Sequence, residues 1–560
     1  MKKLYYYLLF LFCILSFSSA LNGQTVGLFS YQEGSQNGYT LFNPFFTTST
    51  YLIDNCGRVV NEWESTFTPG ASTRLLENGH LLRTATTGIA ANPVFPVNGA
   101  GERIQEVDWD GNILWEFIFS DSTHRMHHDF TVLENGNLLF PAWELKTEAE
   151  AIQAGRNPAL IPDGVLWAEF LVEVDRNTSE IVWEWHFWDH LIQDFDPTKD
   201  NYGVVADHPE LLDINVTGGQ TANGGANCLH INAIDYNPTL DQILINSFFI
   251  TEMFIIDHST TTAEAATHTG GTSTQGGDIL FRWGNPQNYG YTPEAGQIIY
   301  GCHNPHWIPE GLNDAGKIMY FQNGNGRPDG NYSSVDIFTP PIANPNTGQY
   351  TFDAGVSYGP TGPEWSYTAD PVESLYSGFV SGAQRLSNGN TLICSGANGH
   401  FLEINQAGET VWEYINPAIP GGAVTQGNPI PANGGFNLNI VFRCLRYEPN
   451  FPGLAGKDLT PGDPIELGFP VPYDCEIFSG VEEVALDQIN VYPNPAYNIL
   501  IIESTQLINA PVSVFNAVGQ LVESFSLKSE TVELELTNYP SGIYFLKVGN
   551  QVVKQFLVQK

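Results

Sequence analysis

Three histidines at equivalent positions are the strongest candidates for chemistry in this chain. His128 lies eight residues before the turn glycine Gly136, His303 lies eight residues before Gly311, and His230 opens a comparable strand. A neutral imidazole can bind a metal, accept a proton or act as a nucleophile. Three imidazoles that converge resist protonation, because each added positive charge repels the next. The shared position favours convergence over three independent turn histidines.

A zinc site with three histidine ligands is the obvious alternative use of these residues. Against it, each histidine belongs to a different repeat, without the close spacing of a metal motif. We therefore expect neither a bound metal nor a cofactor at the three histidines. The acidic loop DFDPTKDNYG, residues 194–203, could hold calcium, but its spacing does not match an EF-hand loop, so a solvated loop is favoured.

A repeated hairpin must position the histidines. An apolar run, an Asn-Gly turn and a second apolar run recur as RLLENGHLLRT, TVLENGNLLF and QRLSNGNTLI. Asn-Gly between apolar runs is a strong hairpin signal, because both residues accept positive φ at little cost. A second phrase, in which a turn precedes a β-branched pair and Trp, follows as DNCGRVVNEW, DWDGNILWE, DRNTSEIVWE and NQAGETVWE. Each unit therefore holds about four short strands, which is typical of a propeller blade.

Six units can be counted by their first strands. These begin near Ser72, His127, His230, His303, Ser381 and Phe442. The last has no strands after it, and the early stretch YLIDNCGRVVNEW has none before it, so we expect the two to form one blade and close the ring. First strands line the central channel, which would bring the histidines together. The sequence predicts an all-β fold, with a six-bladed β-propeller over residues 21–479.

The two ends of the chain indicate export. Residues 1–20, MKKLYYYLLFLFCILSFSSA, combine two lysines, an apolar run and small residues, which predicts a signal peptide. Residues 480–560 show alternating strands with glycine turns, which predicts a separate small C-terminal β-sandwich. Its phrases VYPNPA and PSGIYFLKV and its basic end KQFLVQK resemble the sorting domain of the type IX secretion system. The resemblance implies export through the outer membrane by that machinery, with removal of the domain at the cell surface, so that the protein is secreted or held at the cell surface.

Composition excludes several partners. The 61 acidic residues against 22 basic ones give a formal net charge of −39, which disfavours nucleic acid and anionic membranes. No stretch after the signal peptide is long enough to span a membrane. An exported chain can form disulfides, but the six remaining cysteines allow 15 full pairings, and free buried thiols are an open alternative.

The propeller resembles the arylsulfate sulfotransferase family. The similar phrases run from about Tyr51 to Pro417 and are HHDFTVLENGN, LHINAIDYNPTLDQILINS, IIDHSTTTAEAATHTGG, GDILFRWGNPQ and SGAQRLSNGNTLI. The resemblance implies an exported six-bladed propeller that moves a sulfuryl group from an aryl sulfate donor to a phenolic acceptor, through a sulfurylated histidine and without a nucleotide donor. It implies that His303 is the nucleophile and that His128 and His230 support the transfer.

The chain departs from the family at one position of the site. The family has an arginine 18 residues after the second histidine, where this chain has Phe248. A missing guanidinium removes a fork of donors matched to an oxyanion. The candidates to bind the substrate instead are Arg327, His306 and His127, with Arg385 and Arg443 as further arginines at blade starts.

Two classes of function therefore stay open. The aligned histidines favour a sulfuryl transferase. Phe248 favours a non-catalytic surface propeller that binds a glycan, a phenolic compound or a protein through the same funnel. Whether the three imidazoles lie within reach of one small anion distinguishes the two.

Overall fold

The computed structural model describes residues 24–216, 225–291, 296–353, 355–469, 475, 490–503, 511–516, 521–548 and 552–560. The predicted signal peptide, residues 1–20, lies outside the described residues. Contacts divide the chain into two compact units, Met1–Cys475 and Glu476–Lys560, and each is described by itself. Within the described part of the chain, no helix is both long and apolar enough to span a bilayer.

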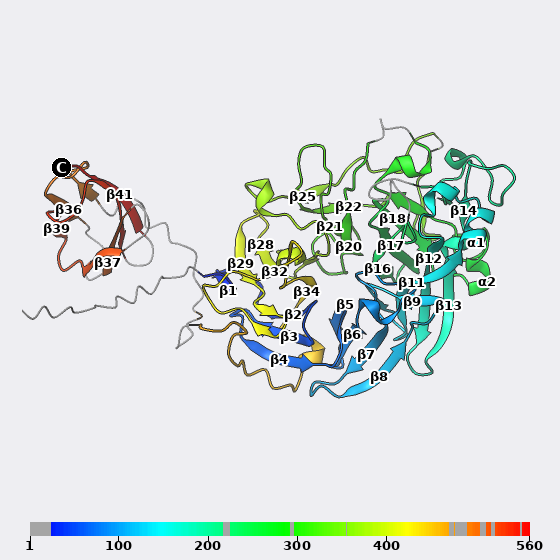
Figure 1. Ribbon diagram of the computed structural model, residues 1–560, viewed down its shortest axis with the longest axis horizontal. Helices are drawn as coiled ribbons and strands as arrows, with labels where there is room; N and C mark the ends of the chain where they lie inside the picture. Colours follow the sequence, from blue (N-terminus) through cyan, green and yellow to red (C-terminus); the bar gives the residue numbers. More distant parts are fainter. Residues whose placement is uncertain are drawn as a thin grey trace, which may run out of the picture. The chain divides into compact units, whose positions relative to one another are not determined.

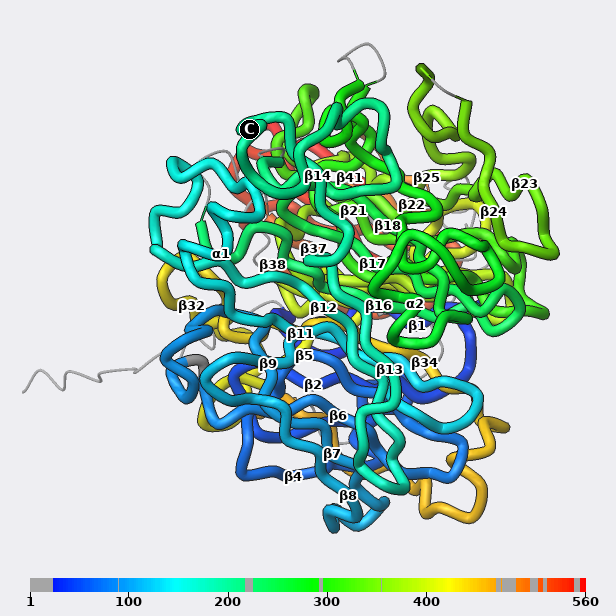
Figure 2. The backbone as a smooth tube through the Cα atoms, turned by 90° about the vertical axis from the view of Figure 1, so that its right-hand side faces the viewer, coloured from blue at the N-terminus to red at the C-terminus, as the bar shows by residue number. Residues whose placement is uncertain are grey.

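The first unit contains six antiparallel sheets that stand around a common centre as propeller blades (Figure 1). The first strand of a blade lies nearest the centre and the fourth lies towards the rim, as β34, β5, β16 and β20 show against β4, β8, β13 and β25. Figure 2 views the side formed by blades 3 and 4. The all-β propeller predicted from the sequence is confirmed.

The blades are numbered from the one that closes the ring. Blade 1 contains β34 (Val441–Tyr447), β2 (Tyr39–Pro44), β3 (Ser49–Asp54) and β4 (Val59–Glu64); blade 2 contains β5 (Thr68–Leu75), β6 (Leu81–Thr86), β7 (Arg103–Val107) and β8 (Ile113–Ile118); blade 3 contains β9 (His124–Met126), β10 (Thr131–Val132), β11 (Leu138–Thr147), β12 (Val165–Asp175) and β13 (Glu180–His186). Blade 4 contains β16 (Ile231–Asn237), β17 (Gln242–Ser247), β18 (Glu252–Asp257) and β19 (Phe281–Trp283); blade 5 contains β20 (Cys302–Trp307), β21 (Ile318–Gln322), β22 (Ser334–Phe338) and β25 (Trp365–Tyr367); blade 6 contains β26 (Gly382–Arg385), β27 (Thr391–Ser395), β28 (His400–Ile404), β29 (Thr410–Ile415) and β1 (Gly27–Tyr31).

Shorter elements lie in the connections. They are β14 (Leu191–Ile192), β15 (Leu212–Asp213), β23 (Ile342–Asn344), β24 (Gln349–Tyr350), β30 (Ala418–Ile419), β31 (Gly422–Ala423), β32 (Ala432–Asn433), β33 (Phe436–Asn437), α1 (Glu148–Gln153) and α2 (Thr262–Ala265). Apolar side chains from facing sheets fill the space between neighbouring blades. In one such cluster Leu82 of blade 2 packs with Phe140 and Phe170 of blade 3, and these side chains are almost fully buried.

The repeated turn glycines form the first hairpin of three blades. Gly79, Gly136 and Gly389 have φ of +82°, +86° and +89°. Glycine adopts this left-handed conformation readily because it has no Cβ. The hairpins therefore lie where the Asn-Gly signal predicts, but only the glycine of each pair is left-handed, because Asn78, Asn135 and Asn388 do not have positive φ.

Blade 3 departs from the regular pattern at its inner edge. The strand predicted to begin at His127 is interrupted, because β9 and β10 pair with separate parts of β11. His127 and His128 stand in the gap between them. The left-handed backbone of His128, with φ +54°, is incompatible with a continuous strand.

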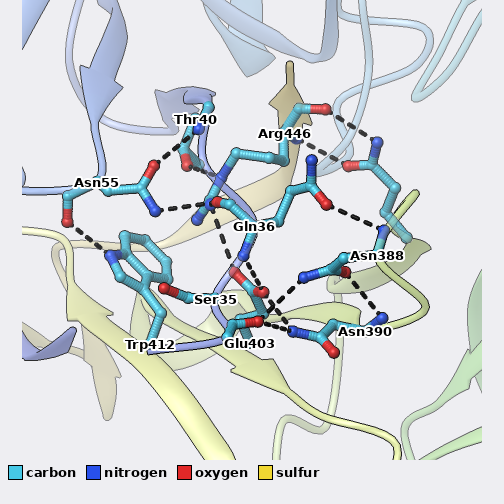
Figure 3. A network of polar contacts seen from close by, with 12 residues as sticks. Ser35, Gln36, Thr40, Asn55, Asn388, Asn390, Glu403, Trp412 and Arg446 are labelled. Carbon is cyan, nitrogen blue, oxygen red and sulfur yellow. Dashed lines mark hydrogen bonds and ion pairs between the residues drawn. The ribbon is translucent and has the colours of Figure 1, made fainter. Parts of the chain in front are cut away.

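The ring closes by pairing of distant strands. As predicted, β34 pairs with the strands that precede blade 2, although its direct partner is β2, with Phe42 opposite Cys444. An additional strand, β1, pairs with β29 of blade 6. A buried polar network reinforces this closure (Figure 3): Arg446 donates to the carbonyl oxygen of Gln36 at 2.6 Å, and the Gln36 amide donates to Glu403 at 2.6 Å.

One disulfide ties the end of the first unit to blade 1. Cys56 pairs with Cys475 across 419 residues of chain. Cys228, Cys302, Cys394 and Cys444 are buried free thiols. The chain therefore contains both a disulfide and free buried thiols, the two alternatives that the sequence left open.

The second unit is a small β-sandwich. One sheet contains β35 (Asn490–Tyr492), β36 (Ile499–Glu503) and β39 (Thr531–Glu535); the other contains β38 (Leu521–Ser526), β37 (Pro511–Asn516), β40 (Gly542–Val548) and β41 (Val552–Val558). Leu500 of the first sheet and Val512, Leu546 and Phe556 of the second belong to one fully buried cluster. The predicted sandwich is therefore present, with a core of its own.

Candidate functional site

The structure brings His128, His230 and His303 together at the inner edges of blades 3, 4 and 5. The ring centroids of His128 and His230 are 4.5 Å apart. The Phe442 ring lies 6.2 Å from both His128 and His303, and the Phe248 ring lies 5.1 Å from His303. His128 and His303 are only 5% and 4% exposed. The three imidazoles therefore lie near one another, with His128 and His303 largely desolvated and His230 partly exposed.

A strained backbone turns two of these histidines into that space. His128 and His230 have φ of +54° and +57°. In blade 5 the left-handed residue is Asn304, with φ +53°, directly after His303. Each such residue costs about 1–3 kcal/mol and persists only where the surroundings hold it. Strain of this kind clusters at functional sites, which supports a functional reading of these three blade starts.

Gly99 leaves room for the His128 ring. The His128 amide donates to the Gly99 carbonyl oxygen at 2.8 Å. A Cβ atom on Gly99, which has φ +82°, would lie 2.0 Å from Nε2 of His128. Any larger residue at position 99 would therefore displace the imidazole.

Asn323 fixes the tautomer of His303. The Asn323 amide nitrogen donates to the carbonyl oxygens of Ser377 at 2.8 Å and Val380 at 3.0 Å. Its Oδ1 therefore faces Nδ1 of His303, at 2.8 Å. An amide oxygen only accepts hydrogen bonds, so Nδ1 carries the proton and Nε2 keeps its lone pair. That lone pair is what a nucleophilic imidazole needs.

A buried chain of hydrogen bonds reaches His128 from Glu169. Nε2 of His127 lies 2.8 Å from Oε2 of Glu169, and its Nδ1 lies 3.0 Å from Nδ1 of His128. His127 and Glu169 are fully buried. A carboxylate only accepts, so His127 donates from Nε2 and accepts at Nδ1 from the Nδ1–H of His128. Nε2 of His128 is thus left with a lone pair.

Protein groups hold that chain in place. The His127 ring stacks on Trp143 with centroids 3.9 Å apart. Oε1 of Glu169 accepts from Nε1 of Trp143 and from the amide of Ile231, both at 3.0 Å. Both nitrogens of His127, expected above to contact substrate, are taken up by protein partners.

His230 has the opposite tautomer from its neighbours. The side-chain amide of Asn227 donates to Nδ1 of His230 at 2.8 Å. Nε2 of a neutral His230 therefore carries the proton and can donate. The three imidazoles thus offer two lone pairs, on His128 and His303, and one N–H donor, on His230.

Burial keeps all three histidines neutral. Desolvation, together with repulsion from His127 and His303, lowers the pKa of His230 to about 3. Desolvation also lowers the pKa of His303 to about 3, with repulsion from Arg443 acting in the same direction. The pKa of His128 is held well below its usual range by burial and then by the other histidines. Neutral imidazole is the form needed for nucleophilic attack or proton acceptance.

Among the candidate arginines, Arg443 lies beside the cluster. Its Nη2 donates to Oδ2 of Asp129 at 3.0 Å, and its guanidinium lies 4.9 Å from the centroid of Phe442. Arg327 instead donates to Ser334 at 2.6 Å. Arg385 donates to Thr391 at 2.7 Å and to Asp314 at 3.1 Å.

His306 is also near the cluster but is oriented by its own strand. Its Nδ1 lies 2.9 Å from the carbonyl oxygen of Asn304. Burial lowers the pKa of His306 to about 4, and Arg443 contributes to the same shift. His306 is therefore neutral, with Nε2 as an acceptor.

The low pKa of His230 predicts a loss of stability in acid. The unfolded state binds a proton near pH 6.5, but the folded state does so only near pH 3, so the free energy of unfolding falls as the pH drops through this window. For one histidine the expected loss by pH 5 is up to about 2 kcal/mol. Denaturant titrations at pH 7.5 and pH 5 should show a smaller loss for His230→Gln than for the wild type. Equal losses would mean that His230 does not titrate in this way.

Two of the solved structures that match the chain are distant from it in sequence and in fold. A protein of unknown function from Bacteroides caccae is 11% identical with a TM-score of 0.37, over 74% of this chain and 99% of its own. A putative 6-phosphogluconolactonase from Bacteroides fragilis is 10% identical with a TM-score of 0.32, over 74% and 99%. Scores of this size carry no argument about function. No curated protein matches the chain.

Two family models cover most of the chain. The model described as a secretion system C-terminal sorting domain matches residues 490–559, so the protein is exported to the cell surface or secreted. The model described as arylsulfotransferase matches residues 30–418, which include all three central histidines. The chain belongs to the arylsulfotransferase family.

Proposed function

We propose that this protein transfers a sulfuryl group from an aryl sulfate to a phenolic acceptor through a covalent intermediate on His303. The observation that carries the proposal is the lone pair on Nε2 of His303, held by Asn323 beside two further neutral imidazoles. Two displacements in sequence replace one difficult transfer with two easier ones.

In the first displacement, Nε2 of His303 attacks the sulfur of the donor. The bond from sulfur to the aryl oxygen breaks, and its electron pair leaves with the phenolate. The Nε2–H of His230 is the donor available to stabilise charge on the phenolate or the sulfuryl oxygens. The hydrogen bond from Nδ1 of His303 to Asn323 supports the positive ring that forms.

In the second displacement, the acceptor phenol attacks the same sulfur. Nε2 of His128 takes the phenol proton, and the bond from sulfur to His303 breaks with its electron pair returning to Nε2. The chain through His127 to Glu169 stabilises the imidazolium that His128 becomes. Each residue returns to its starting state when the proton leaves His128.

Arg443 supplies positive charge near the transferred group in place of the family's arginine. It is 6% exposed and paired with Asp129, so its charge acts at a distance rather than through a fork to the sulfate. This arrangement predicts weaker anion binding than a direct guanidinium contact would give.

A binding function without catalysis is favoured by one observation. The cluster is lined by the aromatic rings of Phe248, Phe249 and Phe442, and Phe249 stacks on His230 with centroids 4.6 Å apart. Such a surface suits an aromatic ligand. A ligand that binds without release of a donor phenol would identify this alternative.

The proposal is tested with the purified mature chain, a chromogenic aryl sulfate and a phenol acceptor. Phenol release that depends on the acceptor, together with a sulfurylated peptide containing His303 in mass spectra taken without acceptor, is the expected result. The reaction should proceed equally with a chelator or with added zinc. Phenol release without any labelled histidine would contradict the proposed intermediate.

Phe248→Arg is expected to raise kcat/KM on aryl sulfates by about 10- to 100-fold. The Phe248 ring lies 5.1 Å from His303 and 6.2 Å from His230, so an arginine here could reach the transferred group. A hydrogen bond to a charged group contributes roughly 1.5–3 kcal/mol. Phe248→Leu is the control, because it removes the ring without adding charge. If both variants behave alike, the missing guanidinium does not limit the reaction.

A further inference from the structure

Two histidines and one carboxylate meet outside the central cluster. His190 follows the short helix η3 (Phe187–Asp189) at the end of blade 3, whereas His268 and Asp278 lie on the connection between α2 and β19 of blade 4. Helix α2 and strand β13, which directly precedes η3, lie at the right-hand rim of the propeller in Figure 1 and on the side that faces the viewer in Figure 2. The group therefore joins the outer parts of two neighbouring blades.

Three potential ligand atoms converge in this group. Oδ1 of Asp278 lies 2.8 Å from Nδ1 of His190 and 2.7 Å from Nδ1 of His268. All three atoms lie within 4.8 Å of one another. One oxygen thus serves two imidazole nitrogens.

In a neutral His190 the hydrogen bonds place the Nδ1 lone pair against the Asp278 oxygen, a repulsive contact that a bound metal ion would relieve. Its Nε2 lies 2.8 Å from the carbonyl oxygen of Ala265, which can only accept, so Nε2 carries the proton. A neutral His190 then directs the lone pair of Nδ1 at a carboxylate oxygen. A backbone carbonyl that binds the outer nitrogen is the usual arrangement around a metal-ligating histidine.

The surroundings hold the His190 side chain and the backbone next to Asp278 in place. The side chain of His190 is fully buried, and its ring stacks on Trp185 at 5.7 Å with an interplanar angle of 11°. Nε1 of Trp185 donates to the carbonyl oxygen of Gly277 at 2.7 Å. A Cβ atom on Gly277 would lie 2.0 Å from the carbonyl oxygen of Ala265, so only glycine allows this approach. The site is therefore built before a ligand arrives.

His258 is a histidine between two carboxylates that a bound proton stabilises without a metal ion. Nδ1 of His258 lies 2.7 Å from Asp241 and its Nε2 lies 3.0 Å from Glu173. Burial acts to lower the pKa of His258, but the two carboxylates outweigh it and raise that pKa to about 9. The group at His190 has a different composition, because it places the nitrogens of two imidazoles on one carboxylate oxygen.

We propose that His190, His268 and Asp278 bind one divalent transition-metal ion, for which zinc is the best match. Two imidazole nitrogens and one carboxylate oxygen are ligands that zinc takes in tetrahedral sites. Ligand atoms around tetrahedral zinc lie about 3.3 Å apart, so the Asp278 oxygen would move back by about half an ångström. The His268 side chain is 61% exposed, which leaves the fourth position to water. The ion links the connections of blades 3 and 4.

The test titrates zinc into the chelator-treated mature chain by calorimetry and replaces zinc with cobalt for visible spectroscopy. One ion per chain and the intense visible bands of tetrahedral cobalt are expected. His268→Ala and Asp278→Asn should each weaken binding by more than the roughly 10- to 100-fold that loss of an outer-shell partner costs. His208→Ala, which removes another exposed histidine 2.8 Å from a carboxylate, is the matched control.

Thermal unfolding gives a second measurement that does not depend on catalysis. Zinc should raise the melting temperature of the wild type and of His208→Ala, but not that of His268→Ala, because a ligand of the folded state stabilises it. His268 is exposed, so its removal should not impair folding. Zinc binding that is unchanged in His268→Ala and Asp278→Asn, or no stoichiometric binding to the wild type, would overturn the proposal.

Discussion

His303→Ala is expected to reduce sulfuryl transfer at least about 1,000-fold. Removal of a nucleophile from a covalent mechanism leaves only the contributions of binding and charge stabilisation. The neighbouring imidazoles have other roles in this mechanism, because Nε2 of His230 carries a proton and Nε2 of His128 is the base for the acceptor phenol. Release of phenol from the chromogenic donor and the mass of the sulfurylated peptide measure the effect.

His303→Ala combined with Phe248→Arg distinguishes a nucleophilic role of His303 from a role in binding the anion. If His303 is the nucleophile, the double variant stays inactive although its anion contact is improved. A matched control is His186→Ala, which removes a partly buried histidine that pairs with Glu144 at 3.1 Å on the outer strand of blade 3. Each variant must first show wild-type melting behaviour. Turnover above about 1% in His303→Ala would remove that residue from the nucleophile role.

The blade architecture could be predicted because its signals are local. The Asn-Gly turns and the strand phrases with Trp lie within a few residues of one another, and they place most hairpins correctly. The strands β1 and β2 were missed, because the segment that holds them carries no such phrase. The pairing of β1 with β29 joins Leu28 to Tyr414, and no periodicity within either segment indicates it.

The site was predictable to the extent that it repeats with the blades. His128, His230 and His303 all lie at the starts of their blades, so the fold brings them together, although His303 is one residue before the left-handed position that His128 and His230 occupy. Glu169 and Asn323 set the tautomers of His128 and His303. Neither residue has a counterpart in the other repeats that the sequence shows, and only the folded chain shows that each faces a histidine. A signal for Glu169 was present nevertheless: a carboxyl group within the apolar run VLWAEFLVEV needs a buried partner.

Glu169→Gln is expected to slow the second displacement and spare the first. The glutamine keeps the shape of the side chain but removes the negative charge that stabilises protonated His128 through His127. General base catalysis contributes about 100- to 10,000-fold, and loss of its support is expected to lower steady-state turnover about 10- to 100-fold. The first displacement does not require proton transfer to His128. Stopped-flow traces should therefore keep the initial burst of donor phenol, while sulfurylated His303 accumulates.

The choice of acceptor phenol distinguishes a role of Glu169 in proton transfer from a merely structural role. A phenol that is already ionised at the assay pH needs no base, so it should restore turnover in Glu169→Gln but not in His303→Ala. Raising the pH towards the pKa of an ordinary phenol, about 10, should narrow the gap between Glu169→Gln and the wild type in the same way. His128→Ala should reproduce both results, because it removes the base that Glu169 supports. A general weakening of the site would instead slow the burst and the steady state together for every acceptor, and that outcome would exclude Glu169 from the proton transfer.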